Sequence, residues 1–414
     1  MRLAQAGPAL PVRFLPVKRG SVVSDSIERI DFPEHENPVT VFSGPGAIGQ
    51  AAGLLADLGA QRVMIVCGQT VAGLPAAKAL ADSAKANGAV RVFDQVEPDP
   101  SDVTCAAGGT AARDFGAEAI VGIGGGSSMD AAKAIAAEAI QAGWTQSQDN
   151  PGQPTEVDFE PLPTILIPTT AGTASEVTPF SVIIYTETKR KLVLSHPKLY
   201  AKYALLDPEL LSTCSPQVRM AAGMDALTHA IESYVSKQAT EQTRRRALEA
   251  IRMLAPHLVR AVEAPGDMAA QQQVQEGAMI AGLAFSKSRL GIVHAMALPL
   301  SALFQVPHGV ANALLLPYGM RFNAEAAAPL YADIAEACGI EISGLTASQA
   351  AITLIEHVEQ LGRAIGAPTR MAEVGVEEAA IPQMAQDAMP SAHIACNPRT
   401  PGMDDLIELY TEAY

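Results

Sequence analysis

Residues 119–133 decide the fold, and they read Ala-Ile-Val-Gly-Ile-Gly-Gly-Gly-Ser-Ser-Met-Asp-Ala-Ala-Lys. The first five residues form an apolar run typical of a buried strand, and the last seven have helical composition. A helix that begins at a glycine-rich turn presents unpaired backbone N–H groups and its positive dipole end to an anion. We therefore expect a pyrophosphate to bind at Gly124, Gly125, Gly126 and Ser127, although a flexible strand–helix turn without a ligand would have the same pattern.

The pattern of a short apolar strand followed by a helix is repeated along the first half of the chain. Such alternation predicts a parallel sheet covered by helices on both faces. After Asp207-Pro208 the spacing of apolar residues is helical almost to the end. The sequence thus predicts an irregular, proline-rich arm at residues 1–38, an α/β dinucleotide-binding domain at 39–206 and an all-helical domain at 207–414. The strands are expected at residues 39–42, 62–66, 90–93, 119–123 and 164–167.

The overall composition excludes several classes of protein. Apolar residues make up 48% of the 414 residues, which favours a large buried core over disorder. Lys and Arg total 29 against 44 for Asp and Glu, and a net charge of −15 disfavours binding to nucleic acid. The most apolar stretch, residues 291–304, is shorter than the roughly 20 residues that span a bilayer. Five widely spaced cysteines form no CxxC pair, and the N-terminus has no continuous apolar segment, so we expect a cytoplasmic protein.

A second polar segment follows the strand expected at 164–167. Residues 168–176 read Pro-Thr-Thr-Ala-Gly-Thr-Ala-Ser-Glu, and their hydroxyl groups suit hydrogen bonding along a ribose or nicotinamide edge. A capped turn that begins a helix at Thr173 or Ser175 is an equal alternative.

The helical half of the chain contains a candidate metal site. Asp225 and His229 lie four residues apart, so a helix places both on one face. His294 and His308 lie in or beside the most apolar stretch, where an imidazole without a partner is unfavourable. Pro299 and Pro307 favour a bend between these histidines, which would bring them to a common point. One carboxylate and three neutral imidazoles suit Fe²⁺ or Zn²⁺, whereas buried core histidines are the alternative.

Taken in order, these motifs resemble the iron-containing (group III) alcohol dehydrogenases from about residue 39 to the C-terminus. The resemblance implies a reversible, metal-dependent hydride transfer between NAD or NADP and a small alcohol or aldehyde. It also implies the architecture shared with dehydroquinate synthase, and a homodimer or larger homo-oligomer. The segments that carry it are residues 124–133, 168–176, 223–232, 291–294, 307–312 and 404–410.

The resemblance also implies roles for individual residues. Gly124 to Ser127 would hold the pyrophosphate, and no catalytic group is expected beyond the metal ligands. The other residues expected to bind the cofactor are Asp99, Thr169, Thr170, Thr173 and Lys191, and those expected to bind the metal, Fe²⁺ before Zn²⁺, are Asp225, His229, His294 and His308.

Three positions depart from the pattern of the family. Leu298 stands where members often have a second histidine, so we expect the proton to come through water or a cofactor hydroxyl. Gly68 stands where many members have an acid that disfavours NADP, so NADPH should be accepted alongside NADH. Lys287 stands where Asn is common. If Lys287 or Arg289 faces the substrate cleft, it would favour an aldehyde with a carboxylate, whereas solvated surface charges are an equal alternative.

Three other functions share parts of this pattern. A metal-independent reductase of the maleylacetate type has the same fold, but here all four ligand positions are retained. A lyase similar to dehydroquinate synthase would need Lys and Arg near the metal for a phosphorylated substrate, and the ligand segments contain almost none. A nucleotide-binding protein without catalytic activity would take up no metal.

Overall fold

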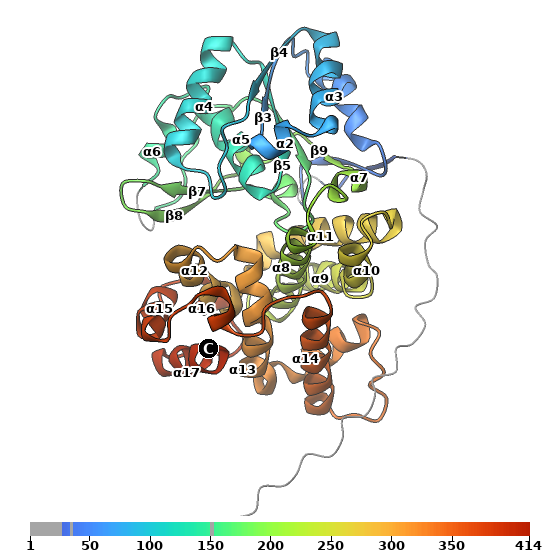
Figure 1. Cartoon of the computed structure of the whole chain (residues 1–414), viewed down its shortest axis with the longest axis vertical. Helices are drawn as coiled ribbons and strands as arrows, with labels where there is room; N and C mark the ends of the chain where they lie inside the picture. The colour runs from blue at the N-terminus through green and yellow to red at the C-terminus, as the bar shows by residue number, and fades with distance from the viewer. Residues whose placement is uncertain (1–26, 34–35, 150–152) are drawn as a thin grey trace, which may run out of the picture.

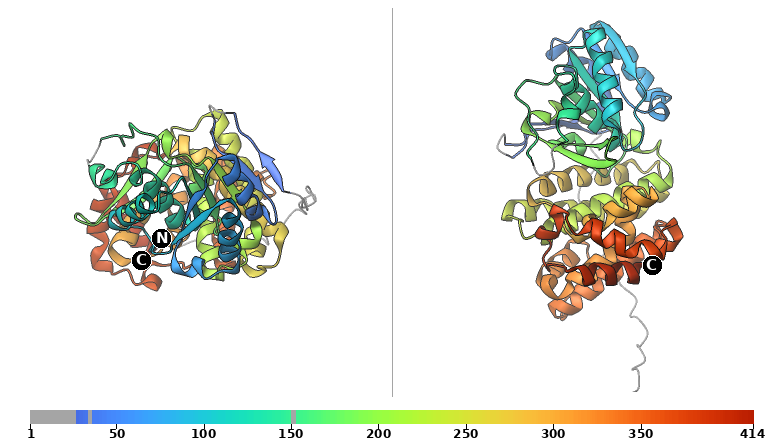
Figure 2. Two further views of the ribbon diagram at one scale, coloured as in Figure 1. Left: turned by 90° about the horizontal axis from the view of Figure 1, so that it is seen from above. Right: turned by 90° about the vertical axis from the view of Figure 1, so that its left-hand side faces the viewer.

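The computed structural model describes residues 27–33, 36–149 and 153–414. Figures 1 and 2 show a region with a β-sheet at one end of the long axis and a region of packed helices at the other. The expected α/β architecture followed by a helical part is confirmed. A boundary at residue 207 remains a proposal, although the last strand of the sheet ends at Leu206.

The sheet has seven strands in the order β1-β2-β9-β6-β5-β3-β4. Each strand in the row β2-β9-β6-β5-β3-β4 is parallel to its neighbours, and β1, at one edge, is antiparallel to β2. The strand bounds are Glu28–Ile30 for β1, Thr40–Ser43 for β2, Arg62–Val66 for β3, Ala89–Phe93 for β4, Ala119–Gly124 for β5, Thr164–Pro168 for β6 and Tyr203–Leu206 for β9.

The expectation that residues 1–38 are irregular is wrong for β1. Glu28, Arg29 and Ile30 pair with Ser43, Phe42 and Val41 of β2. Three residues are too few to show an alternating pattern, and the pairing depends on a neighbouring strand rather than on local sequence. The rest of the expected arm lies partly outside the described residues, which exclude residues 1–26 and 34–35.

The alternating side chains of the central strands explain why helices cover both faces. Val63 and Ile65 of β3 pack with helices α1 and α3, whereas Met64 and Val66 belong to the core on the opposite face, with α4 and α5. All four side chains are buried. The helices of this region are α1 (Ala51–Asp57), α2 (Gln69–Ala72), α3 (Pro75–Ala84), α4 (Asp102–Phe115), α5 (Gly126–Glu138) and α6 (Trp144–Ser147).

A separate hairpin lies beside the main sheet, on the side toward the helices (Figure 1). It is formed by β7 (Phe180–Tyr185) and β8 (Arg190–Ser195), which pair antiparallel. The hairpin therefore brings Phe180 and Lys191 toward the junction of the two regions.

The helical region is built around three long helices, α8 (Pro216–Val235), α11 (Met268–Ser288) and α13 (His308–Ala337), which contribute much of its buried core. In the described part of the chain no helix is long and apolar enough to cross a membrane. The other helices are α7 (Pro208–Leu211), α9 (Glu241–Leu254), α10 (Leu258–Glu263), α12 (Ile292–Phe304), α14 (Ala347–Ala364), α15 (Ile381–Ala388), α16 (Ala392–Cys396) and α17 (Met403–Ala413).

The expected bend between His294 and His308 is present, but Pro299 does not end a helix. Pro299 lies inside α12, which continues to Phe304. The chain then turns at Gln305, whose φ is 57°, and Pro307 precedes α13. Pro307 fixes an extended conformation just before the helix, so His308 becomes the first residue of α13.

Candidate active site

The four expected metal ligands meet at one place in the helical region. Asp225 and His229 lie on α8, His294 on α12 and His308 at the start of α13. The Oδ1 atom of Asp225 is 3.9 Å from His229 Nε2, 3.7 Å from His294 Nε2 and 3.9 Å from His308 Nε2. Ligand atoms of Asp225, His229 and His294 all lie within 4.8 Å of one another. Such spacings are those of atoms that surround one cation at about 2.0–2.2 Å each. We call these four residues the donor cluster.

The side-chain amide of Asn312 fits the same interpretation. Its Nδ2 atom lies 2.6 Å from Asp225 Oδ1, 3.1 Å from His294 Nε2 and 3.2 Å from His308 Nε2. An amide nitrogen has two hydrogens and cannot satisfy three acceptors. The cluster therefore has more lone pairs than the neighbouring donors can use, and a divalent cation would satisfy them.

The members of the donor cluster differ in how their surroundings shift their pKa values. Burial alone would raise the pKa of Asp225, but His229, His294 and His308 outweigh burial and hold that pKa far below its usual range. Burial lowers the pKa of His229 to about 4, so this imidazole is neutral at pH 7. Burial also opposes the charged form of His294, yet hydrogen bonds to Asp225 and Glu232 raise its pKa to about 9. The carboxylates of Asp225 and Glu232 thus favour positive charge on the groups that lie beside them.

Glu232 is a site residue that the sequence analysis missed. One turn after His229 on α8, its Oε2 atom lies 2.6 Å from His294 Nδ1, and its Oε1 accepts a hydrogen bond from the Val293 backbone at 2.7 Å. The Glu232 side chain is only 4% exposed. A carboxylate on Nδ1 fixes the ring orientation and directs Nε2 toward a metal. Glu232 could have been found from its helical spacing relative to Asp225 and His229.

A row of flat side chains leads away from the donor cluster. The His229 ring stacks on Phe285 with centroids 4.3 Å apart, and Phe285 stacks on Phe180 of the hairpin at 6.3 Å. The His393 ring of α16 also lies beside the cluster, with its centroid 6.1 Å from that of His294. These contacts could not be predicted from the sequence, because the residues come from five distant segments.

Within the predicted pyrophosphate segment, residues 124–127, the backbone conformation at Gly124 requires glycine. Gly124 has a φ of 145°, and a Cβ there would lie 2.4 Å from Ser128 Oγ. At Gly126 a Cβ would lie 2.7 Å from Thr173 Cγ2, and at Gly125 it would lie 3.4 Å from Thr170 Oγ1. Helix α5 begins at Gly126, as the sequence predicts. We call residues 124–127 the glycine loop.

Residues 168–176, which we call the threonine loop, lie against the glycine loop. The backbone N–H of Thr169 donates to the Gly124 carbonyl at 2.9 Å. Thr169 is buried, Thr170 is half-buried and Thr173 is exposed. A Cβ at Gly172 would lie 2.8 Å from the Ala222 carbonyl of α8. The threonine loop therefore lies between the glycine loop and the helix that carries Asp225 and His229.

Asp99 and Lys191 are brought together at the same edge of the sheet. Lys191 Nζ lies 2.8 Å from Asp99 Oδ1, and the Asp99 backbone N–H donates to Ser127 Oγ at 3.1 Å. Asp99 has a φ of 51°, a conformation uncommon outside glycine. All nine residues expected to bind the cofactor thus lie in segments that contact one another, namely the glycine loop, the threonine loop, Asp99 and strand β8.

A buried ammonium group joins the two loops. Lys133 of α5 is fully buried, and its Nζ donates to the carbonyls of Ser175, Thr178 and Phe180. Asp130 accepts from Ser175 Oγ at 2.5 Å and from the Val182 backbone at 3.1 Å. Burial lowers the pKa of Lys133 to about 8. These bonds fix the end of the threonine loop and the start of the hairpin relative to α5.

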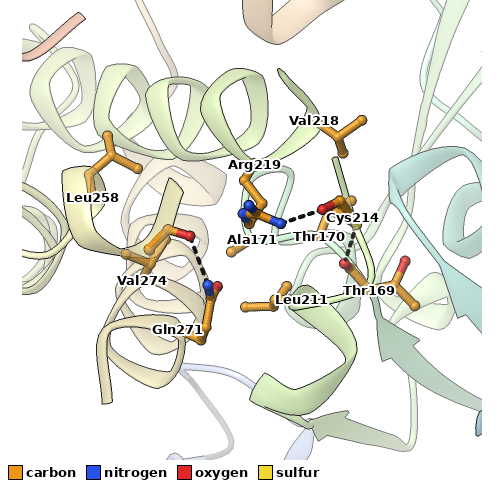
Figure 3. A pocket seen from close by; sticks show the side chains of 11 residues that line it. Thr169, Thr170, Ala171, Leu211, Cys214, Val218, Arg219, Leu258, Gln271 and Val274 are labelled. Carbon is orange, nitrogen blue, oxygen red and sulfur yellow. Dashed lines mark hydrogen bonds between the residues drawn. The ribbon is translucent and has the colours of Figure 1, made fainter. Parts of the chain in front are cut away.

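Figure 3 shows a small pocket that borders the threonine loop. Arg219 of α8 donates to the Cys214 carbonyl, and the Cys214 thiol lies 3.1 Å from the Thr169 carbonyl. Gln271 of α11 donates to the Ala261 carbonyl. These contacts support the threonine loop from the helical side. The lining residues are Thr169, Thr170, Ala171, Leu211, Cys214, Val218, Arg219, Leu258, Ala261, Gln271 and Val274.

Comparison with known families and proteins gives a consistent result over most of the chain. The family model for iron-containing alcohol dehydrogenase matches residues 38–208. The model for the C-terminal part of the Fe-containing alcohol dehydrogenase family matches residues 219–414.

Individual relatives are similar over nearly their whole length. Lactaldehyde reductase of Escherichia coli K12 is 35% identical over 91% of this chain and 98% of its own. The 1,3-propanediol dehydrogenase of Citrobacter freundii is 37% identical over 91% and 97%. The solved structure of an alcohol dehydrogenase from Oenococcus oeni has a TM-score of 0.86 at 31% identity and covers 90% of this chain and 98% of its own.

Proposed function

Because the chain belongs to the iron-containing alcohol dehydrogenase family, we propose that its own residues form one active site between the sheet and the helices. The enzyme is a metal- and nicotinamide-dependent alcohol dehydrogenase or aldehyde reductase, and its substrate is a small alcohol or aldehyde. The observation that carries the site proposal is the approach of three imidazole Nε2 atoms to within 3.7–3.9 Å of one carboxylate oxygen of Asp225.

We assign the divalent ion, Fe²⁺ before Zn²⁺, to Asp225, His229, His294 and His308. The excess of lone pairs over the hydrogens of Asn312 supports this assignment. Glu232 orients the His294 ring through its Nδ1 atom. When bound, the ion polarises the oxygen of the substrate and the nicotinamide exchanges a hydride with its carbon.

We assign NAD or NADP to the glycine loop, the threonine loop and the Asp99–Lys191 pair. Backbone N–H groups at the start of α5 would bind the pyrophosphate, and the absence of a side chain at Gly124 and Gly126 lets this loop pack closely against Ser128 and Thr173. Thr169, Thr170 and Thr173 would then lie along the part of the cofactor that points toward α8. Lys133 and Asp130 hold these loops at a fixed separation.

The proton of the reaction needs a separate source. Leu298, half-buried on α12, carries no proton, and His393 has a pKa lowered to about 4, with burial as the largest cause. We propose that water or a cofactor ribose hydroxyl delivers the proton. We also propose a cytoplasmic enzyme that forms a homodimer or larger homo-oligomer, in line with the five unpaired cysteines.

The test is an assay of purified protein that is depleted of metal and then loaded with Fe²⁺ or Zn²⁺. We expect oxidation of NADH or NADPH by small aldehydes only after loading, with about one ion bound per chain. Full activity after chelation would instead favour a metal-independent reductase of the maleylacetate type.

A further inference from the structure

Arg289, the residue that follows α11, has an unusual backbone conformation. Its φ is 61° and its ψ is −175°, a combination that is essentially confined to glycine. The backbone is held there by a hydrogen bond from the Arg289 N–H to the Phe285 carbonyl and by one from Ser288 Oγ to the Arg289 carbonyl. Strained residues of this kind cluster at functional sites, where the surrounding structure enforces the conformation.

The Arg289 side chain reaches across the junction of the two regions. Its guanidinium carbon lies 6.0 Å from the centroid of Phe180, which belongs to the hairpin of the sheet region. Phe180 stacks on Phe285, and Phe285 stacks on His229 of the donor cluster. Arg289 therefore lies at the outer end of an aromatic wall whose inner end is a proposed metal ligand.

Nothing in the described residues neutralises this guanidinium. Arg289 is exposed and forms no ion pair with a carboxylate of the part of the chain that the structure describes. The neighbouring cation of the hairpin, Lys191, is already paired with Asp99 at 2.8 Å. Arg289 thus offers a planar set of N–H donors, which matches the geometry of an oxyanion.

His393 provides a second polar group beside the donor cluster. Its ring lies 6.1 Å from that of His294, and its Nδ1 atom is buried without a hydrogen-bond partner in the described residues. Burial is the largest cause of the lowered pKa of His393, and the charges of His294 and Arg289 add to it. A substrate chain that extends from the donor cluster toward Arg289 would meet polar groups along its path.

We propose that Arg289 is a specificity-determining residue that binds an anionic group, such as a carboxylate, at the far end of the substrate, with His393 beside the path to it. The preferred substrates are therefore short aldehydes and alcohols that carry a negative charge. This inference rests on the proposed function, because it assumes that the reacting carbon lies at the donor cluster.

The test compares two four-carbon aldehydes, succinate semialdehyde, which carries a carboxylate, and butanal, which carries no charge. We expect the metal-loaded wild type to have the higher kcat/KM for succinate semialdehyde. Arg289→Gln should lower the ratio of the two kcat/KM values by about 10- to 100-fold, the range for a hydrogen bond to a charged group. Arg289→Gly should lower it equally, because glycine suits this backbone conformation and also lacks the charge.

Lys287→Gln is the matched control, since Lys287 is an exposed cation two residues away on the last turn of α11. Its ratio should stay at the wild-type value. A wild type that prefers butanal, an unchanged ratio in Arg289→Gln, or an equal loss in Lys287→Gln would each overturn the proposal.

A binding measurement separates this proposal from the proposed function. Calorimetry of butanoate and butanamide with the NADH complex requires no turnover. We expect butanoate to bind more tightly to the wild type and to lose that advantage in Arg289→Gln. Equal affinities of the wild type for butanoate and butanamide would contradict the proposed anion site, even if the enzyme reduced butanal. An enzyme that binds butanoate more tightly but reduces no aldehyde would contradict the proposed function alone.

Discussion

The sheet side and the helical side of the candidate site use different kinds of residue. On the sheet side, the glycine and threonine loops present backbone groups and small side chains, and a Cβ at Gly124 or Gly126 would collide with Ser128 or Thr173. On the helical side, the donor cluster consists of ionisable side chains whose pKa values are strongly shifted by burial and by one another.

This difference reflects what each side is expected to hold. A dinucleotide is a long ligand that needs room and many N–H donors, so the absence of side chains matters most. A cation is a small ligand that needs a few oxygen and nitrogen atoms at fixed distances, so the identity of each side chain matters most. Damage to one side should therefore leave the function of the other largely intact.

The largest effect is expected on the helical side for His308→Ala. Loss of one of four ligands should reduce metal content and turnover by at least about 100-fold, beyond the range found for outer partners of a metal site. NADH affinity should change little, because His308 lies on α13 and not in the loops of the sheet side. Metal analysis and a fluorescence titration with NADH check both statements. Normal turnover with bound metal would contradict the assignment of His308.

Glu232→Gln tests whether a residue that contacts a metal ligand, but is not itself a ligand, also affects metal binding. The amide keeps the size of the side chain but lacks the negative charge of the carboxylate, whose Oε2 atom lies 2.6 Å from His294 Nδ1. We expect metal affinity to fall by about 10- to 100-fold, with the ion still able to bind at high concentration. A competition titration with a chelator measures this change. An affinity equal to that of the wild type would show that Glu232 serves only the packing of α8 against α12.

Gly124→Ala tests the opposite side of the comparison. A Cβ at φ 145° would be strained and would lie 2.4 Å from Ser128 Oγ, so the glycine loop must shift. Strain of roughly 1–3 kcal/mol corresponds to NADH binding that is about 5- to 150-fold weaker. Metal content should be unchanged. Gly53→Ala on α1 is the matched control, because a Cβ at Gly53 meets nothing within 4 Å. Equal NADH affinity in the two variants would contradict the role of the loop.

Gly68→Asp should have the smallest effect on the reaction with NADH, because the new carboxylate would repel mainly the 2′-phosphate of NADPH. Gly68 precedes α2, and a Cβ there would lie 2.9 Å from the Val96 carbonyl, so any side chain also requires a local shift. Gly68→Ala therefore serves as the reference. Relative to it, the carboxylate should shift preference from NADPH toward NADH by roughly 1–3 kcal/mol. A wild type that already rejects NADPH by several orders of magnitude would contradict this reasoning.

Much of the sheet region could be predicted from sequence because its signals are local. The strand, turn and helix of residues 119–133 are consecutive, and the structure places β5, the glycine loop and α5 there. The strand β1 could not be predicted in this way, because its three residues are a strand only when β2 lies beside them.

In the helical region, local sequence signals predicted less of the site, and contacts between distant segments decided more of it. Sequence spacing alone placed Asp225 and His229 on one helical face, since four residues make about one turn. The approach of His294 and His308 depended on where the chain turns, and the structure places that turn at Gln305 to Pro307, with Pro299 inside α12. A proline in a sequence marks a constraint on the backbone, but packing against neighbouring helices decides whether the helix ends there.

The sequence by itself therefore determined the alternation of strands and helices in the first half, the segments that carry the candidate site and the chemical types of their residues. Only the tertiary structure decided which side chains from distant segments contact one another. Glu232 meets His294 across 62 positions of the sequence, and Arg289 meets Phe180 of the hairpin. Residue types and local spacing are fixed by covalent order and helix geometry, whereas contacts between distant segments arise from the packing of whole helices and strands against one another.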